Sequence, residues 1–344
     1  MLLSQPGFFD LSERYEQLSA SGDPLIQLDQ VIPWNNFRYT LDKAMKKERK
    51  SRAGRPPYDY VLMFKILVLQ GLYNLSDHQI EFQIRDRLSF LRFLGLSLEN
   101  AIPDEKTIWS FREALVKAGA MDKLFKQFNR YLEKIGYEAK CGSMIDASFV
   151  EIPKQRNSKE ENKEIKEGKV PKDWEEKPNK RRQKEVDARW TKKGNENYYG
   201  YKDHINADAK YKLIRRYEVT PANEADCHCF EALLDKRNSG KNVWADCAYR
   251  TPTNEAELKT KKLEDRLQHR PGKGRYLPRH KDDQNHRRSK IRVRVEHVFG
   301  FMENSMNGMR IRTIGIKRAQ FKIGLMNLVY NLCRYGQLTR LGVA

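Results

Sequence analysis

The spacing of apolar residues changes at Gly136, and this change constrains the fold more than any other feature of the chain. Before Gly136 apolar residues recur at helical spacing, and the run Tyr60–Tyr73, apolar nearly all round, predicts a buried helix. Further helices are expected over residues 76–87, 103–116 and 121–135. Several short helices with short connections are typical of an all-α domain, which we expect to comprise residues 1–137.

After Gly136 the patterns of strands and helices alternate. Strands are expected over residues 141–152, 199–207, 212–219, 241–246 and 264–270, with a tight hairpin connection at 208–211. Helices are expected over residues 223–236, 252–263, 289–304 and 317–338. This alternation predicts an α/β domain with a mixed sheet over residues 138–344.

The stretch from Lys154 to Lys193 interrupts this pattern, because it contains 15 basic and nine acidic residues but few apolar ones. Its composition predicts a charged insertion at about 154–197, between the first two strands, that is poorly ordered unless DNA or a partner holds it. Trp174 and Trp190 are its candidate anchors.

Positive charge is concentrated toward the C-terminal end. The chain has 66 Lys and Arg against 46 Asp and Glu, a net charge of +20, and residues 259–294 alone carry 14 basic and four acidic residues. Because this stretch leads directly into the apolar pattern of residues 293–299, we interpret it as a structured surface for a polyanion, most simply nucleic acid. The basic residues 43–55 are consistent either with a contact to phosphates or with a solvated loop.

Composition also limits the compartment and the class of protein. No run of 18 apolar residues is present, which predicts no membrane-spanning helix and no membrane partner. Five cysteines and no signal-peptide pattern predict a reducing compartment, the cytoplasm. The chain has no Gly-rich loop of the nucleotide-binding kind, and Cys227–Cys229 has no second ligand pair at a suitable spacing, so an NTPase and a zinc site are disfavoured.

Three carboxylates are candidates for chemistry. Asp146 and Asp246 lie at the ends of expected strands, and Glu296 lies among apolar residues in a basic stretch. One interpretation of Glu296 is an ion pair with Arg292, one helical turn earlier. The other is that the three carboxylates converge on two divalent metal ions such as Mg²⁺, which prefers oxygen ligands and, in pairs, clamps the attacking and leaving oxygens of a phosphoryl transfer.

The second domain resembles the catalytic domain of bacterial insertion-sequence transposases with an Asp-Asp-Glu triad, specifically the insertion-sequence-five family. The matching stretches are Met144–Ser148, Tyr199–Ile205, Thr220–Glu224, Ala245–Arg250, Arg292–Glu296, Gly324–Leu328 and Tyr330–Leu332. The first part, from about Tyr58 to Leu115, is similar to that family's N-terminal domain, so the resemblance covers roughly residues 55–335.

This resemblance implies an RNase H-like catalytic domain and an N-terminal helical domain for DNA binding or dimerisation. It implies a nucleoid-associated bacterial enzyme that cuts DNA at terminal inverted repeats and joins the 3′-hydroxyl ends to target DNA. Asp146, Asp246 and Glu296 would be the catalytic residues and the ligands of two Mg²⁺ ions, for which Mn²⁺ can substitute. Since two DNA ends are joined in one event, the resemblance implies at least a dimer.

The family signature around its glutamate is a Tyr, two residues, an Arg, three residues, the Glu, six residues and a Lys. Arg292 and Glu296 match it, but Ser289 and Glu303 stand in place of the Tyr and the Lys, so those two roles are not carried over. The residues expected to contact DNA are Arg287, Arg288, Lys290, Arg292, Arg294, Lys202, Tyr249 and Arg250.

Two other functions remain open at this point. One is a metal-dependent nuclease of the same fold that cuts without joining strands. The other is a non-catalytic DNA-binding regulator descended from a transposase, which the intact set of three carboxylates disfavours.

Overall fold

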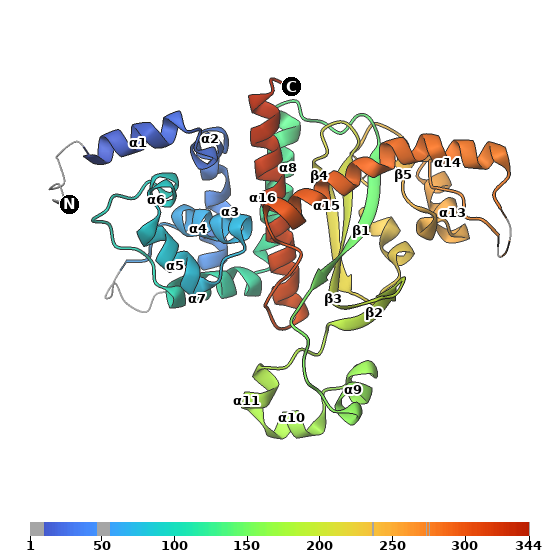
Figure 1. Ribbon diagram of the computed structural model, residues 1–344, viewed down its shortest axis with the longest axis horizontal. Coiled ribbons are helices and arrows are strands. Elements are labelled where there is room, and N and C mark those ends of the chain that lie inside the picture. The colour runs from blue at the N-terminus through green and yellow to red at the C-terminus, as the bar shows by residue number, and fades with distance from the viewer. Residues whose placement is uncertain (1–9, 47–55, 236, 273, 275, 344) are drawn as a thin grey trace, which may run out of the picture. The chain divides into compact units, whose positions relative to one another are not determined.

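The computed structural model describes residues 10–46, 56–235, 237–272, 274 and 276–343, which form two compact units (Figure 1). One unit contains the chain up to Leu124 together with Tyr335–Val343, and the other contains Phe125–Arg334. The division falls within helices α8 (Ala120–Lys134) and α16 (Ile316–Arg340), and the expected domain boundary at 137/138 stays an expectation. Among the described residues no helix is long and apolar enough to cross a membrane.

The first unit is helical, as its periodicity predicts. Its helices are α1 (Asp10–Ala20), α2 (Pro24–Val31), α3 (Arg38–Met45), α4 (Tyr60–Tyr73), α5 (Asp77–Asp86), α6 (Leu88–Leu94) and α7 (Glu105–Lys117), with the 3₁₀ turn η1 (Trp34–Phe37) before α3. The predicted bounds of α4 are confirmed; Asp59 caps its N-terminus by accepting from the backbone N–H groups of Val61 and Leu62. Ser76 and Gln79 form a reciprocal capping box at the start of α5. Of the basic stretch 43–55, residues 47–55 lie outside the described residues.

The second unit is built on a six-stranded mixed sheet. Its strands are β1 (Ser143–Glu151), β2 (Arg189–Lys193), β3 (Glu196–Asp208), β4 (Ile214–Pro221), β5 (Asn242–Trp244) and β6 (Glu264–Asp265). β3 pairs antiparallel with β1 along one edge and with β2 and then β4 along its other edge, while β1, β5 and β6 are parallel. This mixed sheet with helices confirms the predicted α/β, RNase H-like fold class.

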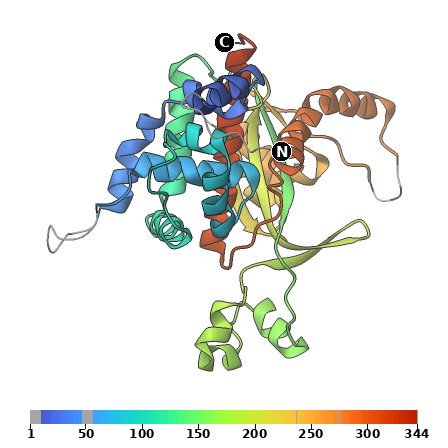
Figure 2. The same cartoon turned by 60° about the vertical axis from the view of Figure 1, so that its left-hand side comes forward.

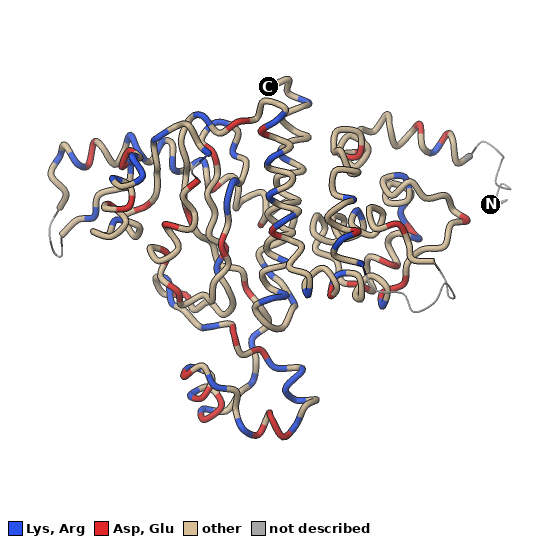
Figure 3. Tube along the Cα trace, turned by 180° about the vertical axis from the view of Figure 1, so that it is seen from behind, with Lys and Arg blue, Asp and Glu red and all other residues tan. Residues whose placement is uncertain are grey.

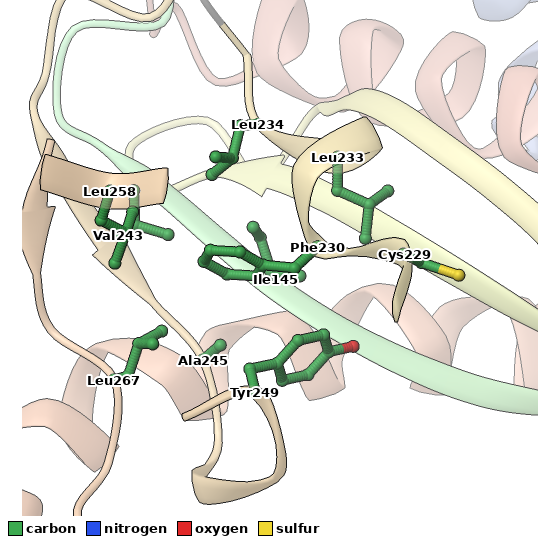
Figure 4. Close-up of a cluster of buried hydrophobic side chains, with 10 residues drawn as sticks. All are labelled: Ile145, Cys229, Phe230, Leu233, Leu234, Val243, Ala245, Tyr249, Leu258 and Leu267. Carbon is green, nitrogen blue, oxygen red and sulfur yellow. The ribbon is translucent and has the colours of Figure 1, made fainter. Parts of the chain in front are cut away.

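Different helices cover the two faces of the sheet. On one face, Asn327 of α16 donates to Asp203 Oδ1 at 3.0 Å, and Asn331 exchanges two 2.8 Å hydrogen bonds with the backbone of Ile214. Ile145 points to the opposite face, into a hydrophobic cluster with residues of α12 (Phe230–Leu233) and α13 (Pro252–Thr260) (Figure 4). Because side chains alternate along a strand, Asp146 points to the α16 face.

The charged insertion is folded, which corrects the expectation that it is poorly ordered. It forms α9 (Lys159–Lys166), α10 (Lys172–Glu176) and α11 (Pro178–Arg182), beyond the ends of β1 and β2 (Figure 2). Trp174 is fully buried among them and donates to Glu161 Oε1 at 2.7 Å. Basic and acidic residues are mixed over the insertion (Figure 3). Residues 189–197 belong to β2, to the turn after it and to the start of β3 instead of to the insertion.

Three further expectations need correction. The helix expected over 223–236 is reduced to η2 (Asp226–Cys229) and α12, because the chain becomes extended at Leu234. The strand expected over 264–270 is only the two residues of β6. The helix expected to begin at Ser289 begins at Arg279: α14 (Arg279–Arg292) leads through the 3₁₀ turn η4 (Val293–Val295) into α15 (Glu296–Gly300) and the π-helical turn η5 (Phe301–Ser305).

Candidate functional site

The register of β1 and β5 brings two of the candidate carboxylates together. Ser143 pairs with Val243 and Met144 with Trp244 in a parallel ladder, so Asp146 and Asp246 both follow two residues after the last pair. At this proximity the charge of Asp246 raises the pKa of Asp146. Gly142 permits this close strand pairing, since a Cβ there would lie 2.5 Å from the carbonyl oxygen of Asn242.

Asp146 lies in a largely buried position. Its side chain is 19% exposed, its Oδ1 accepts from the backbone N–H of Ala147 at 2.9 Å, and its Oδ2 accepts from Arg292 Nη1 at 3.0 Å. Burial raises the pKa of Asp146 to about 6, and the charge of Asp246 adds to this effect, whereas the Ala147 hydrogen bond and the Arg292 charge oppose it. A carboxylate in this position is stabilised by any additional positive charge.

Asp246 is held by the turn that follows it. Its Oδ1 accepts from the backbone N–H of Ala248 at 2.8 Å and so caps the 3₁₀ turn η3 (Cys247–Tyr249). The side chain is therefore fixed at the carboxyl end of β5, beside Asp146.

Glu296 is connected to this pair through an arginine. Arg292 Nη2 lies 3.1 Å from Glu296 Oε1 while Nη1 contacts Asp146, so one guanidinium bridges the helical segment and the sheet. The ion pair between Arg292 and Glu296, one of the two interpretations of Glu296, is thus present. Its extension to Asp146 could not be anticipated from the spacing of residues. Glu296 is more exposed than Asp146, at 54% of its side chain.

The donor set has the chemistry that a hard divalent cation requires, although the three carboxylates are not arranged around one point in this structure. Within the described residues no group of three or more His, Cys, Asp and Glu side chains is placed to hold a metal ion. The guanidinium of Arg292 lies between Asp146 and Glu296 instead. Asp146 and Asp246 fit such an ion, because they are adjacent oxygen donors whose mutual repulsion a cation would relieve.

The basic residues of α14 divide into two groups. Asn285 and Arg288 bind the segment 267–270: Asn285 exchanges hydrogen bonds with the backbone of His269, and Arg288 donates to the carbonyl of Leu267. Arg287 and Lys290 are exposed, and neither forms a salt bridge with any residue that the structure describes. With the exposed Arg294 of η4 they form a basic stripe, defined as Arg287, Lys290 and Arg294, at successive helical spacings of three and four residues.

Three of the residues expected to contact DNA are instead structural. Tyr249 is fully buried in the hydrophobic cluster (Figure 4). Lys202 is 9% exposed and donates to Asp226 Oδ1 and to the carbonyl of Glu224, both at 2.7 Å. Arg250 is bonded to Glu255, to Asp265 and to two backbone carbonyls. Their position next to family motifs does not make them accessible, and direct DNA contact by these three residues stays a prediction.

One cation that the sequence did not single out lies near the basic stripe. Lys212, in the turn between β3 and β4, has its Nζ 2.9 Å from Nδ1 of His297, and Arg294 donates to Ala209 O in the same turn at 3.3 Å. The available signal was the pair of lysines within the hairpin connection, which is more often read as solvation of a turn.

Comparisons with known families cover most of the chain. Residues 12–114 match a family model described as a transposase domain (DUF772). Residues 138–332, more than half of the chain, match a family model described as a transposase DDE domain, and this range includes Asp146, Asp246 and Glu296. No solved structure matches the chain.

Proposed function

The chain belongs to the DDE transposases of insertion sequences, and from this premise we propose that it cuts DNA at the terminal inverted repeats of an insertion sequence and joins the freed 3′-hydroxyl ends to target DNA. The observation that carries the proposal is the placement of Asp146 beside Asp246, with Glu296 linked to Asp146 through Arg292. Membership of the insertion-sequence-five family, indicated by the sequence motifs, is part of the proposal.

In this proposal Asp146, Asp246 and Glu296 are the metal ligands. Bound Mg²⁺, or Mn²⁺ in its place, supplies Lewis-acid stabilisation of the attacking and leaving oxygens of a phosphoryl transfer. The chain's own contribution is rigidity: β1 fixes Asp146, and the cap on Ala248 fixes Asp246.

Arg292 has two consecutive roles in the proposal. In the absence of a cation it neutralises Asp146 and Glu296, which reduces repulsion in a site of three carboxylates. A cation held by those oxygens would take over this neutralisation, and the guanidinium of Arg292 would then be free for another partner next to the site. A planar guanidinium suits a DNA phosphate, to which it can donate two parallel hydrogen bonds.

The exposed basic stripe supports double-stranded DNA as the partner. Arg287, Lys290 and Arg294 continue along α14 and η4 to Glu296, so a DNA backbone bound along the stripe leads into the carboxylates. The helical unit is proposed to bind DNA or to mediate dimerisation. Because two element ends must be brought together, we propose at least a dimer.

The proposal is tested with purified full-length protein and a duplex that carries the terminal repeat found beside the open reading frame. With Mg²⁺ present, the strand that is to be transferred, labelled at its 5′ end, should appear first as a shorter cleaved product and then joined to a longer target duplex. Cleavage without joined product would indicate the nuclease instead, and binding of the repeat without any cleavage would indicate the regulator. Addition of a chelator in excess of Mg²⁺ should stop both steps.

A further inference from the structure

The turn between β3 and β4, residues 209–213, gathers positive charge from three elements. Lys212 of the turn lies against His297 of α15, with Nζ 2.9 Å from Nδ1. Arg294 of η4 donates to the carbonyl of Ala209, and Arg334 of α16 donates through Nε to the carbonyl of Tyr211 at 2.7 Å. Since an ammonium group can only donate, Nδ1 of His297 is the acceptor in this contact.

The charges of Lys212 and Arg294 are not paired with acidic groups within the described ranges of the chain. Neither Lys212 nor Arg294 forms a salt bridge with a carboxylate in the part of the chain that the structure describes. Asp208, the carboxylate of the turn, is buried and accepts from Arg215 and from the backbone N–H groups of Tyr211 and Leu213. Partial burial lowers the pKa of Lys212, and the charges of Arg334 and Arg294 lower it further. A bound anion would relieve this repulsion.

The backbone of Lys212 has an unfavourable conformation that its surroundings maintain. Lys212 has φ of 61°, the left-handed region that non-glycine residues rarely adopt. Two hydrogen bonds maintain it: its N–H donates to Asp208 O at 3.1 Å, and its carbonyl accepts from the hydroxyl of Tyr330 at 2.8 Å. Such conformations persist where the surroundings enforce them, and they concentrate at functional sites.

We propose that Lys212, Arg294 and His297 form a site for one non-scissile backbone phosphate of the bound DNA end. This inference rests on the proposed function and adds that binding of this phosphate sets the position of the cut. Arg294 and His297 flank Glu296 in sequence, so a phosphate held by them fixes how far along the strand the DNA can move relative to the carboxylates.

The test asks whether the loss of one phosphate charge and the loss of the Lys212 side chain affect DNA binding independently. Full-length protein is titrated with terminal-repeat duplexes in which each backbone phosphate in turn is replaced by a neutral methylphosphonate. For the wild type, a methylphosphonate at one non-scissile position should weaken DNA binding at least about fivefold. For Lys212→Gln, a methylphosphonate at that position should not weaken binding further. The slope of log K against log salt should fall by about 0.9 for Lys212→Gln.

Lys210→Gln is the matched control, because Lys210 is an exposed lysine of the same turn whose Nζ is bonded to the hydroxyl of Tyr211. It should keep the methylphosphonate effect in full. If Lys212→Gln does not fold, Arg294→Gln replaces an exposed side chain and should give the same loss of the effect.

Three outcomes would overturn the site. One is an undiminished methylphosphonate effect in both Lys212→Gln and Arg294→Gln, which leaves the proposed function intact. The second is a change in oligomeric mass of Lys212→Gln with unaltered DNA binding, which would assign the cluster to an acidic group of a second copy. The third is a wild type that binds no terminal-repeat DNA, which would overturn the proposed function as well.

Discussion

Arg292 Nη1 lies 3.0 Å from Asp146 Oδ2, although the two residues are 146 positions apart in the sequence. The second arm of the same guanidinium contacts Glu296, so the arginine occupies the space between two of the three candidate metal ligands. A positive side chain in this position competes with a cation for the same oxygens. The strength of that competition can be measured without any DNA.

We expect Arg292→Gln to bind Mn²⁺ about fivefold more tightly than the wild type in the absence of DNA, a change of about 1 kcal/mol. The physical reason is the loss of the competing guanidinium. Metal titration by calorimetry measures the affinity, and the rise of the melting temperature with Mn²⁺ gives an independent readout. Arg287→Gln, which removes an exposed arginine of the same helix, should match the wild type; weaker binding by Arg292→Gln would contradict the competition.

Asp246→Asn should reduce DNA cleavage and joining by at least about 100-fold while binding of the terminal repeat changes little. An asparagine keeps the Oδ1 that accepts from Ala248, so the local fold should survive, but it removes the charge that holds a cation. Gel assays of cleavage and binding in Mg²⁺ measure both properties. Asp282→Asn, an exposed carboxylate of α14, is the control, and a wild-type cleavage rate for Asp246→Asn would remove Asp246 from the site.

Stability should depend on pH through Asp203. Burial raises the pKa of this carboxyl from its usual value of 3.8 to about 7, against which the Asn327 hydrogen bond acts only in part. The folded state therefore holds the proton more tightly than the unfolded chain, and stability falls as pH rises from about 4 to about 7. Asp203→Asn should remove that loss, on the order of 2–4 kcal/mol, and be more stable than the wild type at pH 8 but not at pH 4. The free energy of unfolding of both proteins is measured in urea at pH 4 and at pH 8. An equal change between the two pH values in wild type and Asp203→Asn would contradict the prediction.

The salt dependence of DNA binding should separate the two groups of basic residues on α14. Neutralising Arg287 and Lys290 together should lower the slope of log K against log salt by about 1.8, because each phosphate contact contributes about 0.9. Arg288→Gln should leave the slope nearly unchanged and instead lower the melting temperature, since Arg288 is bonded to Leu267 and His269. A slope unaffected by the double variant would show that the stripe does not touch DNA.

Local patterns were sufficient for much of the fold. The apolar run of α4, the strand that carries Asp146 and the strand that precedes Asp246 follow from periodicity, which is a property of neighbouring residues. Helix α14, which the structure describes in full, buries none of its side chains and so has no apolar periodicity to reveal it. It is positioned by polar contacts with residues 267–270, which no spacing rule predicts.

Local patterns predict only part of the candidate site as well. The expected proximity of Asp146 and Asp246 depends on one parallel strand pairing, and that could be anticipated from strand ends. The burial of Tyr249 and Lys202 could not be anticipated from the sequence, because it depends on which face of the sheet the cluster around Phe230 occupies. The bridge from Arg292 to Asp146 likewise requires the tertiary fold.

The insertion offers the last prediction. Trp174 is the centre of its three helices, and Glu161 receives hydrogen bonds from Trp174 and Lys180, which lower the pKa of Glu161 to about 2. Its base is anchored separately, because Glu185 and Asp187 accept from the backbone N–H groups of Gly315 and Ile316 at the start of α16. The insertion should therefore unfold independently of the sheet.

Trp174→Ala should make residues 154–184 sensitive to trypsin while the strands remain protected, since the loss of a buried tryptophan costs about 3–5 kcal/mol. Trp174→Phe, which retains a buried aromatic ring, is the matched control. If the insertion clamps DNA near the cut site, terminal-repeat DNA should protect it in the wild type. Trp190, which is 47% exposed and stacked on Tyr199, should then lose accessibility to quenchers, whereas Trp174 is buried already and should not change. Identical digestion with and without DNA would exclude the clamp.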